Sequence, residues 1–240
     1  FNPYSAGHLR PIQAEAHYEY MRSMKKENIV YCEVGMNGGH SAAVALLASS
    51  SSQVHSFDMQ EWKYSAIVAD FLSQTFPDRF HAYNGSSFVT APNYIKNSEN
   101  PRCDVALIVG MHTYEGAMQD LTNFYNGAMA CNHYLFYDDI YAGSGRALEK
   151  MISDGKIEII EKFTFDYNSE QACLNVYYPV SEMYSRKYRK YLSWDDVNTN
   201  YKAKYQCSLQ KEGWSFAILK FKGGKYNNCR SNNQKPSNSG

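Results

Sequence analysis

The chain has 240 residues, of which 44% are hydrophobic and 20% charged, enough for one well-buried α/β domain with an insertion. Lys and Arg number 24, as do Asp and Glu, so charge gives no reason to expect a nucleic-acid or anionic-membrane partner. No apolar run approaches the roughly 20 residues that span a bilayer. The chain begins at Phe1 rather than Met, so a missing signal peptide carries no weight.

The first regular element that the sequence predicts is an amphipathic helix over residues 11–24. Its apolar residues recur at helical spacing, and Pro11 suits a position near the helix start. A helix of this kind most simply covers the edge of a sheet.

A strand, a glycine turn and a helix follow in immediate succession. Residues 29–34 form a short apolar run that contains Glu33 and predicts a buried strand. The glycines of the turn are Gly35, Gly38 and Gly39. Ser41 is placed to help cap the helix predicted over residues 41–48. Such a turn brings backbone close to a ligand, with the first N–H groups of the helix facing it.

The spacing of this turn differs from the dinucleotide fingerprint G-x-G-x-x-G, because an acid, Glu33, stands two residues before the first glycine. A second strand, residues 53–58, ends in Asp58, about 20 residues further on, where a ribose-binding carboxylate belongs. Together these features resemble motif I of class I S-adenosylmethionine-dependent methyltransferases. The resemblance implies that Glu33 and the turn hold the methionine part of the cofactor and that Asp58 holds the ribose.

A helix over residues 62–76, a third strand from Phe80 and a short helix over residues 91–97 come next. In the resembling family, the residues after the third strand lie beside the adenine, and the leading helix helps to close the cofactor site. The expected cofactor contacts are Glu33, Gly35, Asn37, Gly38, Gly39, Ser41, Asp58, Met59 and Ser86, with Ser87, Gln13 and Tyr18 as further candidates.

A fourth predicted strand, residues 105–109, leads into a turn and a helix over residues 115–125. This stretch is similar to the family-24 subgroup, which includes macrolide-sugar O-methyltransferases and carries Asp-Gly-x-His-x-Tyr followed by Asp. The residues that fit are Gly110, His112, Tyr114, Glu115, Gly116 and Asp120. Val109 stands where the subgroup has aspartate. The resemblance implies that His112 is the catalytic base, whereas His112 alone could merely cap the following helix.

Two consecutive carboxylates, Asp138 and Asp139, follow another apolar run and precede a helix over residues 146–154. In the subgroup such a pair joins the earlier aspartate around a divalent cation, and oxygen ligands suit Mg²⁺. The resemblance therefore makes both residues catalytic candidates and metal ligands. Val109 removes one ligand, so Mg²⁺ is expected to bind weakly or not at all. Adjacent strand-end side chains point to opposite faces, so one aspartate is expected to be structural.

The end of the chain predicts two further strands, residues 156–165 and 213–221, that would pair in antiparallel fashion. The tyrosine-rich insertion between them, residues 166–212, either covers substrate or forms a homodimer, or is a decoration on the sheet edge. Residues 223–240 predict a disordered tail. The resemblance implies one doubly wound α/β domain, residues 1–222, with a seven-stranded, mostly parallel sheet.

The six cysteines show no zinc-site spacing. Cys32 is most simply a buried core residue, while Cys103 and Cys131 lie near the starts of strands that could be neighbours. The even count and the sequon at residues 84–86 permit a secreted protein. The resemblance puts this sequon at the ligand-proximal end of a strand, a poor place for a glycan, which favours an intracellular location.

The function that these residues favour is methyl transfer from S-adenosylmethionine to an oxygen of a small molecule of sugar or polyol type. Neither nucleic acid nor a membrane is expected as a partner. Two alternatives stay open. The first is that the fold serves binding or assembly without catalysis, which Val109 and the insertion favour. The second is that the chain is a nucleotide-using enzyme of another doubly wound type.

Overall fold

The computed structural model describes residues 9, 11–138, 140, 143–165 and 214–226. Nearly all of them belong to one compact unit, residues 1–162 and 216–240. A second unit, residues 163–215, contributes only residues 163–165 and 214–215 to the described part of the chain. The predicted insertion, residues 166–212, lies outside the described residues, so both interpretations of it stay predictions.

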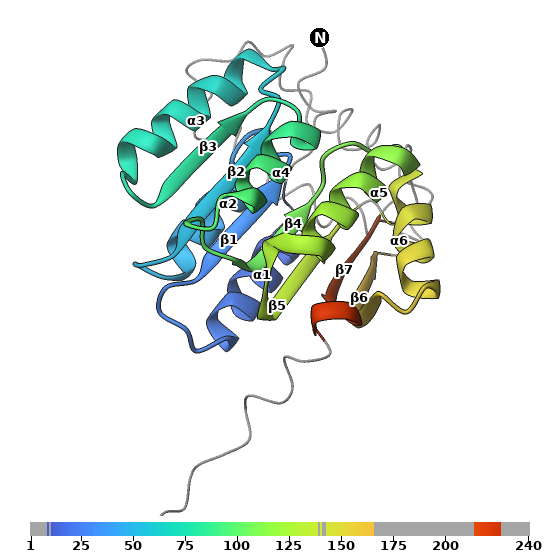
Figure 1. The fold of residues 1–240 in the computed structure, drawn as a ribbon. Helices are drawn as coiled ribbons and strands as arrows, with labels where there is room; N and C mark the ends of the chain where they lie inside the picture. The colour runs from blue at the N-terminus through green and yellow to red at the C-terminus, as the bar shows by residue number, and fades with distance from the viewer. Residues whose placement is uncertain (1–8, 10, 139, 141–142, 166–213, 227–240) are drawn as a thin grey trace, which may run out of the picture. The chain divides into compact units, whose positions relative to one another are not determined.

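A seven-stranded sheet forms the centre of the fold, with strand order β3-β2-β1-β4-β5-β7-β6 (Figure 1). The strands are β1 (Val30–Val34), β2 (Gln53–Asp58), β3 (Phe80–Asn84), β4 (Cys103–Ile108), β5 (Met129–Tyr137), β6 (Ile157–Phe165) and β7 (Trp214–Phe221). The first five pair in parallel, and β7 runs antiparallel to β5. The predicted doubly wound α/β sheet is confirmed, with β7 inserted between β5 and β6.

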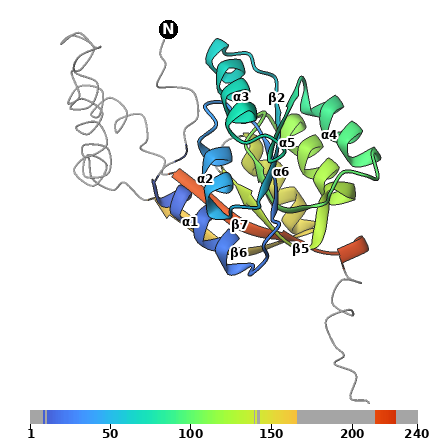
Figure 2. The same ribbon diagram turned by 90° about the vertical axis from the view of Figure 1, so that its left-hand side faces the viewer.

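Helices cover both faces of the sheet. They are α1 (Pro11–Ser23), α2 (His40–Ala48), α3 (Lys63–Thr75), α4 (Ser87–Lys96), α5 (Tyr114–Asn123), which continues as the π-helix η1 (Phe124–Ala128), and α6 (Gly143–Ser153). Figure 2 shows α1, α2 and α3 on one side of the sheet and α4, α5 and α6 on the other. None of the helices that the structure describes is long and apolar enough to cross a lipid bilayer.

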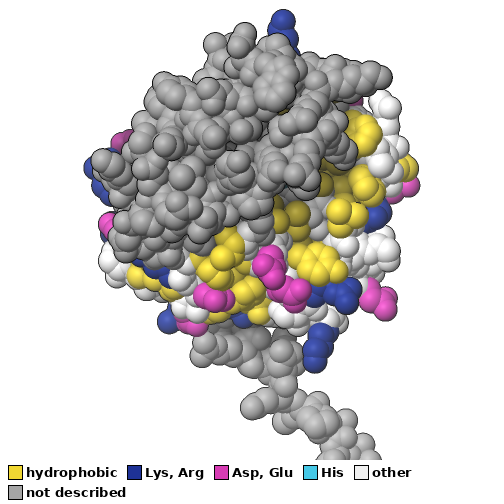
Figure 3. Space-filling view, turned by 180° about the vertical axis from the view of Figure 1, so that it is seen from behind, with side chains coloured by type: hydrophobic (Ala, Val, Ile, Leu, Met, Phe, Trp, Pro, Cys, Tyr) yellow, Lys and Arg dark blue, Asp and Glu magenta, His cyan; other side chains and the backbone are white. Residues whose placement is uncertain are grey.

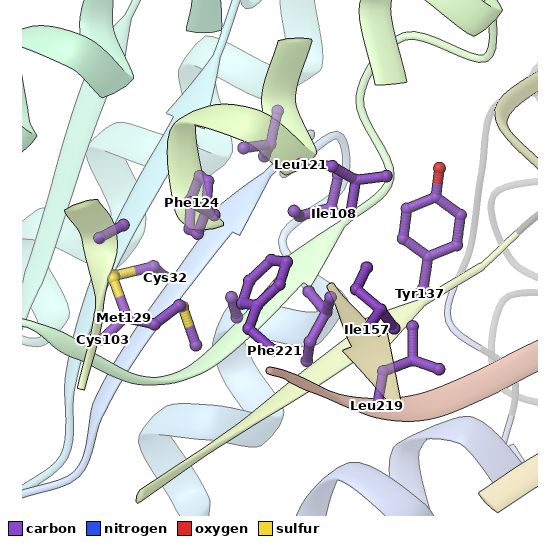
Figure 4. Packing of buried hydrophobic residues seen from close by; sticks show 14 of the residues in the cluster. Cys32, Cys103, Ile108, Leu121, Phe124, Met129, Tyr137, Ile157, Leu219 and Phe221 are labelled. Atoms are coloured by element: carbon purple, nitrogen blue, oxygen red, sulfur yellow. A yellow bond between two sulfur atoms is a disulfide. The ribbon is translucent and has the colours of Figure 1, made fainter. Parts of the chain in front are cut away.

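The strand order reverses direction between β1 and β4, and this reversal positions the site. Both strands are buried along their whole length, which explains why each reads as a continuous apolar run. The core packed on β4 includes Leu121, Phe124 and Leu219 (Figure 4). Ligands of open α/β sheets bind outside the carboxyl ends of the strands at such a reversal. The turns after β1 and β4 are therefore where a ligand is expected.

A disulfide joins Cys32 of β1 to Cys103 of β4, with their Cα atoms 5.8 Å apart (Figure 4). Both cysteines are fully buried. Cys32 is therefore the buried core residue that the sequence predicted, and its bond to Cys103 is an addition to that prediction. Cys131 on the neighbouring strand β5 is also disulfide-bonded. The other three cysteines lie outside the described residues.

Two predicted boundaries move in the structure. Helix α4 begins at Ser87 rather than residue 91, because the Ser86 hydroxyl caps it by accepting a hydrogen bond from the Phe88 N–H at 3.3 Å. The predicted tail begins later than residue 223, because Tyr226 is buried and donates to the Tyr125 carbonyl at 3.0 Å. Residues 227–240 lie outside the described residues.

The coloured part of the surface in Figure 3 carries acidic and basic side chains interspersed among hydrophobic ones. No single sign of charge dominates this face in the part of the chain that the structure describes. The mixture agrees with the equal numbers of acidic and basic residues in the sequence.

Candidate cofactor and catalytic site

The glycine turn after β1 is held tightly between its neighbours. Gly35 has a φ of 93°, and a Cβ there would lie 2.8 Å from the Val109 carbonyl oxygen. Gly39 has a φ of 72°, and a Cβ there would lie 2.6 Å from a methyl group of Val68. Both positions need glycine for their backbone angle and for space. At these two positions the turn therefore presents backbone atoms and no side chain.

Helix α2 begins differently from the sequence prediction. Its N-cap is Gly39, which makes no side-chain cap, and Ser41 lies inside the helix. The Ser41 hydroxyl donates to the Glu33 carboxylate instead. The predicted cap is therefore wrong, because a buried carboxylate competes for the hydroxyl. The first N–H groups of α2 lack a side-chain acceptor from the cap residue, which suits a ligand carboxylate at this end.

Glu33 lies beneath the turn and is fully buried. Its carboxylate accepts hydrogen bonds from Ser41 and, at 2.9 Å, from Ser56 on β2. Burial raises the pKa of Glu33 to about 7, and the two hydroxyl donors only partly oppose that rise. These bonds tie Glu33 to α2 and β2, and its predicted contact with the methionine part stays a prediction.

The burial of Glu33 gives a pH-dependent expectation for stability. The pKa is raised from 4.5 to about 7 on folding, so folding favours the protonated form, and stability is lost as pH rises through this window. We compare the free energy of unfolding of Glu33→Gln with that of the wild type. This difference should shift in favour of the variant by about 3 kcal/mol as pH rises through the window. Urea denaturation at pH 5 and pH 8 checks this, with exposed Glu115→Gln as the control. A difference in unfolding free energy between Glu33→Gln and the wild type that is the same at both pH values would contradict this expectation.

Asp58 is fixed at the end of β2 by backbone groups. Its two carboxylate oxygens accept the N–H groups of Asn37 at 3.0 Å and Gln60 at 2.6 Å. Asn37 has a φ of 50°, and its side-chain oxygen accepts a hydrogen bond from the Tyr64 hydroxyl. A carboxylate has about four acceptor positions, so Asp58 keeps capacity for two ribose hydroxyls. Asp58 is partly exposed.

The remaining predicted cofactor residues lie at the same edge of the sheet. Met59, directly after Asp58, is 52% exposed, which suits packing against a flat ring. Ser86 follows β3 and caps α4. Gly38 lies in the turn with the His40 ring close by, where a Cβ would lie 3.0 Å from the ring. The order β3-β2-β1 gathers these residues along one edge.

A second group of predicted residues lines a small, open hollow of about 10 Å³ at the ends of β4 and β5. Its lining residues are Ile108, Val109, Gly110, Met111, His112, Ala117, Tyr137, Asp138 and Ser144. The Ser144 N–H donates to the His112 carbonyl at 3.1 Å, and the Tyr137 hydroxyl donates to the Ser144 carbonyl at 3.0 Å. These bonds tie the start of α6 to the turn that carries His112. The structure thus brings His112 and Asp138 together.

His112 does not cap helix α5. The cap is Thr113, whose hydroxyl accepts the Gly116 N–H at 3.2 Å. His112 itself is exposed, beside Tyr114 at the start of the helix. The alternative that His112 is a capping residue is therefore wrong. An exposed imidazole at the rim of a hollow is suited to accept a proton from a bound molecule.

Comparison with known proteins identifies this arrangement. Residues 32–140 match the model of methyltransferase family 24, described as a methyltransferase domain. This part of the chain, slightly less than half of it, is therefore similar to a methyltransferase domain. The match spans the turn after β1, Asp58, the His112 turn and Asp138. No curated protein gives a significant sequence match to the chain.

Solved structures share the fold of this methyltransferase domain at low sequence identity. An S-adenosylmethionine-dependent methyltransferase from Geobacter sulfurreducens, in complex with S-adenosyl-L-homocysteine, has 12% identity and a TM-score of 0.54, covering 91% of this chain and 95% of that chain. A TDP-rhamnose 3′-O-methyltransferase of calicheamicin biosynthesis has 16% identity and a TM-score of 0.50, covering 63% and 76%. An rRNA methylase from Streptococcus thermophilus has 11% identity and a TM-score of 0.53, covering 89% and 98%. The shared fold leaves the methyl acceptor open.

The expected metal ligands do not assemble into a cation site in the described part of the methyltransferase domain. Asp138 accepts a hydrogen bond from the Gln13 side-chain amide at 2.8 Å, Val109 contributes an apolar side chain, and Asp139 lies outside the described residues. Within the described residues, no three His, Cys, Asp or Glu side chains gather closely enough to hold a metal ion. These residues do not fit the three-carboxylate site that the resemblance implies.

Asp120, which fits the family-24 pattern, lies beneath the turn after β4. It is fully buried in α5, and burial raises its pKa to about 6. A Cβ at Gly110 would lie 2.7 Å from a methyl group of Val34 and 3.3 Å from the Asp120 carboxylate, which explains why glycine occupies that position. Sequence reasoning missed Ser56 and Tyr64, which hold Glu33 and Asn37. The available signal for Ser56 was a hydroxyl two residues before Asp58, on the same face of the strand.

Proposed function

We propose that this methyltransferase domain binds S-adenosylmethionine over the turn after β1 and transfers its methyl group to an oxygen of a small molecule of sugar or polyol type. The observation that carries the proposal is the pairing of Asp58 with the Asn37 N–H, which fixes a partly exposed carboxylate beside the glycine turn. The start of α2 lies at the same turn and lacks a side-chain cap. A ribose diol and a methionine carboxylate match these two groups.

The chemistry needs only a base and an acceptor in line with the sulfonium. The acceptor hydroxyl gives its proton to His112 as its oxygen attacks the methyl carbon. The carbon–sulfur bond breaks, and its electron pair stays on sulfur to give S-adenosyl-L-homocysteine. Most of the acceleration of such a displacement comes from positioning the two reactants. Asp138, across the hollow from His112, would accept a hydrogen bond from the acceptor and orient it.

Oxygen is proposed as the methylated atom because the Gly110-x-His112-x-Tyr114 pattern belongs to the family-24 match. The likeness to a TDP-rhamnose 3′-O-methyltransferase supports a sugar-type acceptor. The likeness to an rRNA methylase shows that the fold alone does not select the acceptor. The hollow that contains His112 and Asp138 would make that selection.

Calorimetric titration with S-adenosyl-L-homocysteine tests the cofactor part of the proposal. We expect the wild type to bind and Asp58→Ala to bind about 10- to 100-fold more weakly, because hydrogen bonds to a charged group are lost. Exposed Asp70 on α3 supplies the control, since Asp70→Ala should bind like the wild type. Equal affinity in Asp58→Ala would contradict the assignment. If the folded wild type does not bind S-adenosyl-L-homocysteine, the result would support the non-catalytic alternative, which Val109 favours. A heat of binding with NAD alone would support a nucleotide-using enzyme of another type.

A further inference from the structure

The hollow at the ends of β4 and β5 is largely apolar on the side where the family resemblance places a cation. Ile108, Val109, Met111 and Ala117 contribute this side. Divalent cations such as Mg²⁺ need several oxygen ligands, and an aliphatic side chain supplies none. Among the described lining residues, Asp138 is the one carboxylate.

An amide already occupies the position beside Asp138. Gln13 of α1 is 2% exposed, and its amide N–H donates to one Asp138 oxygen at 2.8 Å. A cation bound through the same oxygen would have to share it with this donor. The partly positive N–H group of the buried Gln13 amide would then lie next to the ion, which is electrostatically unfavourable.

Packing between α1 and β5 holds Gln13 in place. His17, one helical turn after Gln13, stacks on Phe136 with ring centroids 4.1 Å apart. Tyr20, a further turn along, meets Tyr134 edge to face at 5.0 Å. Helix positions 13, 17 and 20 thus pair with strand positions 138, 136 and 134, matching the helical period to the strand period. The contact between Gln13 and Asp138 is the end of this series and is positioned by it.

We propose that this methyltransferase domain works without a divalent cation and that Gln13 is a positioning residue that holds Asp138 at the place where the sequence resemblance implies an ion. The inference rests on the proposed function. Without a cation to chelate two substrate oxygens, the sugar-type or polyol acceptor that fits carries an apolar carbon beside the reacting oxygen. Val109 and Met111, which line the hollow, would contact that carbon, and His112 would take the proton directly.

Electron paramagnetic resonance of Mn²⁺ tests the cation part. The wild type should leave added Mn²⁺ free at millimolar concentration, and its binding of S-adenosyl-L-homocysteine should be the same with Mn²⁺ or with a chelator. Val109→Asp should gain Mn²⁺ binding by at least tenfold. Mn²⁺ binding by the wild type that is lost in Asp138→Asn would overturn the inference. Failure of Val109→Asp to gain Mn²⁺ would overturn the role given to Val109.

A kinetic measurement tests the role of Gln13. With an accepted hydroxyl compound, Gln13→Leu should lower kcat by about tenfold, because Asp138 is no longer held in position, while the affinity for S-adenosyl-L-homocysteine stays that of the wild type. Exposed Gln119→Leu is the control and should keep the wild-type kcat. An unchanged kcat in Gln13→Leu would show that Gln13 does not position Asp138. No binding of S-adenosyl-L-homocysteine by the folded wild type would instead count against the proposed function.

Discussion

Replacing His112 with alanine should lower the rate of methyl transfer by a factor of about 10² to 10⁴, the range in which a positioned general base contributes. This corresponds to a loss of roughly 3 to 5.5 kcal/mol of transition-state stabilisation. The physical reason is that a neutral hydroxyl is a weak nucleophile and His112 is the exposed base at the hollow. The affinity for S-adenosyl-L-homocysteine should stay within about twofold, because His112 lies on the turn after β4 rather than at Asp58.

Methyl transfer from labelled S-adenosylmethionine to a panel of hydroxyl compounds measures this effect. His81→Ala is a matched control, because His81 lies on β3, stacks on His55 and does not line the hollow. The control should keep nearly the full rate. Full activity in His112→Ala with an accepted hydroxyl compound would remove His112 from the mechanism. A loss of cofactor affinity equal to the loss of rate would give His112 a binding role instead.

Removing the Cys32–Cys103 disulfide should lower the free energy of unfolding by about 4 kcal/mol. The disulfide closes a loop with a sequence separation of 71 residues, and loop closure restricts the unfolded chain. Both cysteines are fully buried between adjacent strands, so the native sheet keeps its packing when small residues replace them. Cross-links of this kind are typical of proteins from oxidising compartments.

Urea denaturation of Cys32→Ala, Cys103→Ala and the double variant measures the effect. Each single variant should lose nearly as much stability as the double variant, because either change breaks the same bond. Losses that simply add would indicate two independent core residues. A change below about 1 kcal/mol in the double variant would show that the cross-link contributes little.

The parts of the fold that the sequence predicted are those set by short-range pattern. The apolar runs of β1 and β4, the glycine turn and the position of Asp58 all follow from residue order and periodicity. The predicted Ser41 cap failed because the hydroxyl has a buried acceptor, Glu33, whose side chain lies beneath the same turn. The sequence thus predicted correctly that the Ser41 hydroxyl makes a hydrogen bond near this turn, but it predicted the wrong partner for that hydroxyl.

The parts that the sequence could not predict depend on register between distant segments. The pairing of Cys32 with Cys103 needs the alignment of β1 with β4. The contact of Gln13 with Asp138 needs the direction of α1 along β5, although the resemblance had placed the leading helix near the cofactor site. The spacing of residues in the sequence does not predict how β1 aligns with β4 or how α1 aligns with β5. Both alignments are set by packing in the folded sheet.

A crystal structure of the protein with S-adenosyl-L-homocysteine would show whether the cofactor lies over the glycine turn. We expect ribose hydroxyls within hydrogen-bond distance of Asp58, the homocysteine part over the turn at Gly35 to Gly39, and the sulfur facing the hollow that His112 and Asp138 line. Ligand bound elsewhere on the domain, or an adenosine whose ribose does not contact Asp58, would contradict it.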